Sequence, residues 1–169
     1  MPFQIVRNDI TKMSVDAVVN AANTALQQGS GVCGAIFAAA GAKQLQAACD
    51  AIGRCETGEA VITNAFNMPA KFIIHTAGPI WRGGNAGEER LLKSCYINSL
   101  YLAERNGCET VAFPLISSGI YGYPKEQATQ VAISAIKEFL EDHDMMVYLV
   151  AFDDETARLG EELSSPQRR

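Results

Sequence analysis

The sequence predicts a three-layer α/β/α domain, and two features of the chain carry that prediction. Segments typical of strands alternate with segments typical of helices. Two of the strand-like segments, Thr110–Ile116 and Met146–Phe152, are almost continuously apolar, which is the pattern of strands buried on both faces. Helices should therefore cover both sides of the sheet. The 169 residues suit one domain, expected over residues 1–163, with a disordered polar tail at 164–169.

Individual elements follow from the spacing of apolar residues. Runs rich in β-branched or alternating apolar residues predict strands at Phe3–Arg7, Asp16–Asn20, Glu59–Asn64, Lys71–Thr76, Thr110–Ile116 and Met146–Phe152. The clearest helix has Pro124 in its first turn and continues through Ala128, Val131, Ala132, Ala135, Ile136, Phe139 and Leu140 at helical spacing. Further helices are expected at Glu88–Asn106, ended by Gly107, and at Gly34–Ala40 and Ala42–Asp50, separated by Gly41.

Charge and cysteine usage exclude several classes of protein. Fourteen basic and 19 acidic residues give a formal charge of −5, so we expect no duplex nucleic acid partner. The N-terminus lacks the pattern of a signal peptide, and no apolar run could cross a bilayer. The five cysteines form no C-x-x-C pair, which argues against a zinc site or a disulfide framework. We expect a cytoplasmic protein with reduced thiols, no membrane partner, and no metal or other cofactor.

The first glycine loop, Gly29–Gly34, has the form G-x-G-x-x-G and opens a helix. This form is typical of dinucleotide-binding Rossmann folds, but here Thr24–Gln28 separate it from the preceding strand. In such folds an acidic residue about 20 residues after the glycines ends the second strand and binds the ribose. Asp50 lies near that distance along the chain, but in a helical stretch. The N–H groups of such a loop still point at an anion, although a tight turn alone would also require glycine.

The second glycine loop, Ser117–Pro124, joins a buried strand to the clearest helix. A strand, a glycine loop and a helix in this order form a phosphate-binding arrangement. The loop also contains Tyr121 and Tyr123, which could border a sugar or simply cover the edge of the core. Two such loops in one small domain indicate a diphosphate held from both sides.

Five segments in order resemble the macrodomain family: Asn8-Asp9-Ile10-Thr11, VDAVVNAANTAL from 15, GSGVCGAI from 29, HTAGP from 75 and ISSGIYGYP from 116. The resemblance extends from Phe3 to about Leu159. It implies a mixed, mostly parallel sheet between helices, with ADP-ribose in a cleft at the strand ends.

The resemblance also implies residue roles. Asp9, the Ile10 N–H and Phe152 would contact the adenine, and Asn23 and Tyr121 would lie at the distal ribose. Asn20 belongs to the same asparagine segment and would brace the loop, and His75 would be a structural histidine satisfied by the backbone. The complete set of expected ligand-binding residues is Asp9, Ile10, Asn20, Gly31, Val32, Gly34, Ser117, Ser118, Gly119, Ile120, Tyr121, Gly122 and Phe152.

One position departs from the hydrolytic members of that family. They carry an aspartate ten residues after the second asparagine of the segment Asn20-Ala21-Ala22-Asn23, and Cys33 stands there in this chain. A neutral thiol is a poor general base toward water. Cys33 could be a nucleophile, activated by the helix N-terminus, or simply a small residue that fits the loop.

Three functions are consistent with these residues. The chain could hydrolyse ADP-ribosyl esters, acting on mono-ADP-ribose on acidic side chains or on O-acetyl-ADP-ribose, with Asn23 and Cys33 as candidate catalytic residues. It could instead be a reader module that binds ADP-ribose without turnover, which the cysteine favours. Hydrolysis of ADP-ribose 1″-phosphate is a third possibility. The expected partners are ADP-ribose, ADP-ribosylated protein or O-acetyl-ADP-ribose.

Overall fold

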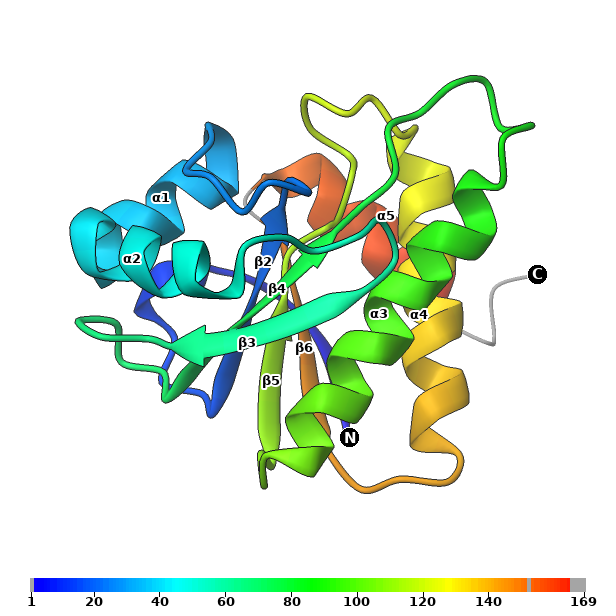
Figure 1. The fold of residues 1–169 in the computed structure, drawn as a ribbon. Helices are drawn as coiled ribbons and strands as arrows, with labels where there is room; N and C mark the ends of the chain where they lie inside the picture. Colours follow the sequence, from blue (N-terminus) through cyan, green and yellow to red (C-terminus); the bar gives the residue numbers. More distant parts are fainter. Residues whose placement is uncertain (1, 152, 165–169) are drawn as a thin grey trace.

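The computed structural model describes residues 2–151 and 153–164 and shows a six-stranded sheet between two layers of helices (Figure 1). In chain order the elements are β1 (Phe3–Arg7), a short 3₁₀ helix (Ile10–Lys12), β2 (Ala17–Ala22), α1 (Gly31–Ala40), α2 (Ala42–Ile52), β3 (Ala60–Asn64), β4 (Phe72–Ala77), α3 (Glu88–Arg105), β5 (Thr110–Phe113), α4 (Lys125–Leu140), β6 (Met146–Ala151) and α5 (Asp154–Ser164). No helix among them is long and apolar enough to cross a membrane.

The sheet has the order β1-β6-β5-β2-β4-β3. All neighbouring strands are parallel except β3 and β4, which are antiparallel. This topology confirms the three-layer α/β/α architecture with a mixed, mostly parallel sheet. Residues far apart in the sequence become neighbours in this register, for example Asn20 on β2 and His75 on β4.

Separate cores fill the two faces of the sheet. On one face α1 and α2 pack against the side chains of Val18, Ile73 and Ala112. On the other face α3 and α4 pack against Val19, Ile74 and further strand residues, and α5 covers β1 and β6. Successive residues of β2 thus point to opposite cores, as expected for a strand buried on both faces.

Several element boundaries differ from those expected. Strand β5 ends at Phe113, because Pro114 has no N–H group to continue the sheet. Helix α1 begins at Gly31, three residues early, so most of the first glycine loop is its first turn. Strand β2 continues to Ala22, which pairs with Ala77 of β4.

Helix α5 was not predicted. Its N-terminus is capped by Asp153, whose carboxylate accepts a hydrogen bond from the Thr156 N–H (2.8 Å). Thr156 and Gly160 are buried on it and Leu163 packs against the core, so its inner face consists mostly of small residues. Ser164, expected in the tail, is its last residue, and residues 165–169 lie outside the described part of the chain.

The fold creates a crevice at one edge of the sheet. Strands β1, β6, β5, β2 and β4 are mutually parallel, so their carboxyl ends lie at the same edge. From there the neighbouring strands β2 and β5 lead to helices on opposite faces, α1 and α4. Ligands bind at such a switch point in open α/β sheets.

Candidate functional site

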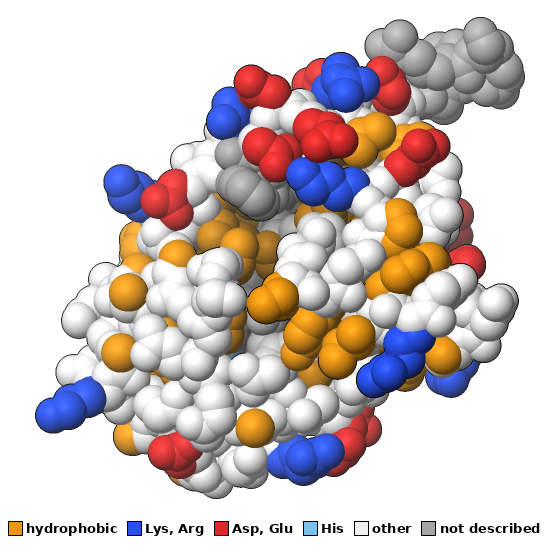
Figure 2. Space-filling view, turned by 90° about the horizontal axis from the view of Figure 1, so that it is seen from above, with side chains coloured by type: hydrophobic (Ala, Val, Ile, Leu, Met, Phe, Trp, Pro, Cys, Tyr) orange, Lys and Arg blue, Asp and Glu red, His pale blue; other side chains and the backbone are white. Residues whose placement is uncertain are grey.

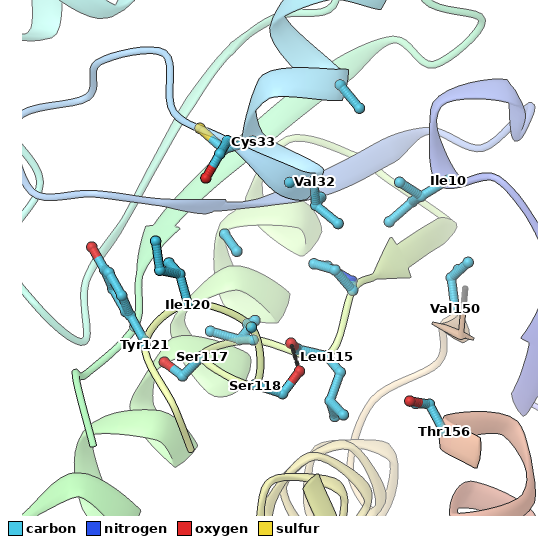
Figure 3. Close-up of a pocket in the computed structure, with 18 of the residues that line it drawn as sticks. Ile10, Val32, Cys33, Leu115, Ser117, Ser118, Ile120, Tyr121, Val150 and Thr156 are labelled. Carbon is cyan, nitrogen blue, oxygen red and sulfur yellow. Dashed lines mark hydrogen bonds between the residues drawn. The ribbon is translucent and has the colours of Figure 1, made fainter. Parts of the chain in front are cut away.

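A cavity of about 970 Å³ lies at this edge, and Figure 2 shows the molecule hollowed there. Its walls are the segment after β1, the end of β2, both glycine loops and the end of β6. Figure 3 shows Val32 and Cys33 at the start of α1 facing Ile120 of the second glycine loop across the cavity, with Ile10 at the other end. The two loops singled out in the sequence are therefore opposite walls of one cavity.

The first glycine loop presents the N-terminus of α1 to the cavity. Ser30 is the N-cap residue, but its side chain makes no capping hydrogen bond. The first N–H groups of a helix have no intrahelical partner, so this end remains available to an anion. Gly31, Val32 and Cys33 line the cavity, whereas Gly34 does not. A Cβ atom on Gly34 would lie 2.5 Å from the Gly29 carbonyl oxygen, so this glycine serves the packing of the loop.

Asn23 lies in the cavity wall just after β2. Its Oδ1 accepts a hydrogen bond from the Gln27 N–H (2.9 Å), and its Nδ2 donates to the Gln27 carbonyl (2.9 Å). An amide can make four hydrogen bonds, so one N–H and one lone pair remain for a ligand. The bonds to Gln27 fix the plane of the side chain.

The second glycine loop is braced from behind by the segment after β4. Ser117 has a left-handed backbone (φ 68°), and its Oγ donates to the Pro79 carbonyl (2.8 Å). The Tyr121 carbonyl accepts from the Trp81 N–H (2.9 Å). Residues 117–121 line the cavity, whereas Gly122, with φ 78°, turns the chain away from it. Ile120 is 88% exposed and stands free at the rim.

Asp9 and Ile10 line the end of the cavity beside β1. Asp9 Oδ1 accepts from the Thr11 hydroxyl (2.7 Å) and the Thr11 N–H (3.0 Å). These bonds hold the pKa of the Asp9 carboxyl below its usual range, so it is ionised at neutral pH. Phe152, expected at this end, lies outside the described residues.

A buried polar chain lies behind the other end of the cavity. Asn20 is fully buried, and it does not line the cavity. Its Nδ2 lies 3.1 Å from His75 Nδ1 and 3.7 Å from Cys33 Sγ. Among the described residues, Asn20 Oδ1 has no hydrogen-bond partner. Asn20 therefore sits behind the loop as a brace, and not in direct reach of a ligand in the cavity.

The tautomer of His75 follows from its partners. The Thr63 hydroxyl donates to the Asn64 carbonyl (3.1 Å), so it accepts from His75 Nε2–H (2.9 Å). His75 Nδ1 is then a lone-pair acceptor for Asn20. Burial lowers the pKa of His75 to about 4, which keeps the ring neutral. The ring is satisfied by side chains, and not by the backbone as expected.

Two cationic side chains in the cavity wall were missed in the sequence. Arg7 pairs with Asp154 (2.6 Å), and Lys125 pairs with Asp153 (3.2 Å) and Glu155 (3.3 Å). Both side chains form ion pairs with acids around the start of α5, so backbone N–H groups remain the main groups that could bind an anion here. Only the unpredicted α5 brings these charges together, and no local pattern indicated it.

Chemically reactive groups are few in this cavity. Asp9 is the only carboxylate among the lining residues that the structure describes, and it lies at the β1 end. Cys33 Sγ, near Asn23, donates a weak hydrogen bond to the Gln27 carbonyl (3.8 Å). Within residues 2–151 and 153–164 no three His, Cys, Asp or Glu side chains are grouped to hold a metal ion.

Known proteins resemble this chain over most of its length. The model of the Macro domain family matches residues 19–132. A macro domain-containing protein of Chlorobaculum tepidum is 58% identical over 137 residues, which cover 81% of this chain and 79% of that one. A protein of Escherichia coli K12 named O-acetyl-ADP-ribose deacetylase is 47% identical over 170 residues, covering 98% and 96% of the two chains.

Solved structures share the fold. A variant of the Oceanobacillus iheyensis macrodomain, solved with ADPR, superposes with a TM-score of 0.89 at 40% identity, covering 94% of this chain and 89% of that one. The Trypanosoma brucei macrodomain in complex with ADP-ribose gives a TM-score of 0.87 at 34% identity, with coverage of 95% and 68%.

Proposed function

Because this chain belongs to the macrodomain family, we propose that it binds ADP-ribose in the cavity at the strand ends and hydrolyses ADP-ribosyl esters. The observation that carries the proposal is the pairing of the two glycine loops across one cavity. The relatives named O-acetyl-ADP-ribose deacetylase match almost the whole chain and support the hydrolytic part.

Each part of the ligand has a matching part of the wall. The ionised Asp9 would accept a hydrogen bond from the adenine amino group, beside Ile10. The diphosphate would lie between the first turn of α1 and residues 118–120 of the second glycine loop. The distal ribose would then reach Asn23 and Tyr121. Gly34 and Gly122 would support the loops without touching the ligand.

Ester hydrolysis adds water across one C–O bond and releases ADP-ribose and a carboxylic acid. Asn23 would orient the ribose through its remaining N–H group and lone pair. No carboxylate of the described wall lies beside it to act as a base, so we propose that a ligand phosphate positions the water. For an ester at the anomeric carbon of the distal ribose, attack at that carbon expels a carboxylate, which is a good leaving group, so positioning and electrostatics can supply much of the rate.

The second candidate function is a reader of ADP-ribose that does not turn it over. Cys33 favours this alternative, because among the described residues no base is hydrogen bonded to its thiol. The thiol makes a weak hydrogen bond to the Gln27 carbonyl, and Asn20 separates it from the neutral His75. The substrate of a hydrolase could be O-acetyl-ADP-ribose or an ADP-ribosylated protein.

The two functions are separated by assaying O-acetyl-ADP-ribose and a glutamate-ADP-ribosylated protein with the wild type, Asn23→Ala and Cys33→Asp. We expect a hydrolytic wild type and a rate lower by about a hundredfold in Asn23→Ala, because the ribose loses its positioning contact. Asn85→Ala, an exposed asparagine outside the cavity, is the matched control and should retain full activity.

Three other results would change the proposal. An inert wild type with an active Cys33→Asp variant would establish the reader function. Equal rates in Asn23→Ala and the wild type would remove Asn23 from the mechanism. Calorimetry that detects no binding at millimolar ADP-ribose would contradict both functions.

A further inference from the structure

The loop between Asn23 and Ser30 contains a backbone conformation that its sequence does not favour. Leu26 has a φ of 58°, in the left-handed region, although its side chain is only 1% exposed. A branched residue there is about 1 kcal/mol or more above its preferred conformations. Such a conformation persists only where surrounding contacts fix it. Both ends of the loop, Asn23 and Gly29, lie in the cavity wall, so its shape sets the wall.

One side chain outside the cavity binds the strained residue and the residue two positions after it. Gln46 projects from α2, where its Oε1 accepts from the Gln28 N–H (3.0 Å) and its Nε2 donates to the Leu26 carbonyl (3.0 Å). Nε2 also donates to Asp50 Oδ1 (2.9 Å). With both N–H groups and the carbonyl engaged, the amide has one fixed orientation. Gln46 thus clamps the loop by bonding one backbone carbonyl and one backbone N–H, as a neighbouring strand would.

The clamp reaches the cavity through one further residue. Gln27 lies between the two backbone groups that Gln46 binds, and it makes both backbone hydrogen bonds to the Asn23 side chain. Displacement of Leu26 and Gln28 would therefore displace Gln27 and release the Asn23 amide. The same displacement would move Gly29, whose carbonyl packs against Gly34 of α1.

We infer that Gln46 is a positioning residue that holds the distal-ribose and diphosphate wall in its binding geometry, an inference that rests on the proposed ADP-ribose site. A loop that populates this geometry only part of the time binds more weakly in proportion to that fraction. At the adenine end of the cavity Asp9 is held by hydrogen bonds from Thr11, outside this loop, so we expect that end to be much less affected.

Gln46→Glu tests the inference, because it keeps the size and the acceptor but replaces both N–H donors with oxygen. That oxygen would face the Leu26 carbonyl and the Asp50 carboxylate. Gln44→Glu, an exposed residue of the same helix, adds the same charge without touching the loop. Calorimetry compares ADP-ribose with AMP, which lacks the second phosphate and the distal ribose.

We expect Gln46→Glu to weaken ADP-ribose by about tenfold, the loss of roughly one good hydrogen bond, and AMP by less than about twofold. Amide hydrogen exchange should accelerate in residues 24–30 of this variant only, and Gln44→Glu should match the wild type for both ligands. A general loss of stability would instead weaken both ligands together.

Two contrary results have different meanings. If the wild type binds ADP-ribose and Gln46→Glu binds it equally well, or loses both ligands in parallel, the positioning role is wrong and the proposed site stands. If the wild type binds no ADP-ribose, the proposed function fails and the positioning role fails with it.

Discussion

Gly34→Ala is expected to lower the affinity for ADP-ribose by about a hundredfold, because an ångström-scale shift of the wall removes the aligned contacts. The new Cβ would lie 2.5 Å from the Gly29 carbonyl oxygen, and a backbone atom cannot rotate away from it. Either the start of α1 or Gly29 must move, and both belong to the cavity wall. Calorimetry with ADP-ribose measures the loss.

A matched control separates this local effect from lost stability. Gly160→Ala in α5 also places a Cβ in a tight contact, 2.8 Å from Ile5 Cδ1, but Gly160 does not line the cavity. Overpacking of this kind costs about 1–3 kcal/mol, so its melting temperature should fall. Its ADP-ribose affinity should remain that of the wild type. A folded Gly34→Ala variant that binds ADP-ribose within about threefold of the wild type would show that the wall tolerates the shift.

The sequence predicted the parts of this protein that depend on local pattern. The apolar runs at 110–116 and 146–152 indicated strands buried on both faces, and the two cores confirm this for the strands observed at 110–113 and 146–151. Both glycine loops could be found because glycine, serine and a following helix lie within a few residues of one another. Helix α5 was missed because its buried positions are Thr156 and Gly160, which are not large apolar residues, although Leu163 packs against the core.

Contacts between distant segments could not be predicted from the sequence. The pairing of Asn20 with His75 depends on the register of β2 and β4, and the clamp of Gln46 on the loop depends on how α2 packs. The sequence marked Gly34 as part of a phosphate-binding motif, but its tight contact with Gly29 appears only in the folded chain. For the same reason no local sequence pattern indicated that Arg7 and Lys125 line the cavity.

The free energy of unfolding is expected to fall as the pH is lowered from about 6.5 to about 4, and His75 is the cause. Burial lowers its pKa to about 4 in the folded protein, against an ordinary value of 6.5. Between these values the unfolded chain binds a proton that the folded chain does not, so acid favours unfolding. A shift of this size corresponds to about 3 kcal/mol when fully expressed.

Urea unfolding at several pH values between 7 and 5 measures this slope above the range where most carboxylates titrate. His75→Gln should flatten it, because glutamine can serve the same two neighbours, accepting from Asn20 and donating to Thr63, but cannot be protonated. His143→Gln, at the surface pair with Glu104, provides the matched control for the other histidine of the sequence. If that variant flattens the slope and His75→Gln does not, the acid sensitivity belongs to the α3–α4 surface, and the buried chain from Thr63 to Cys33 is not its source.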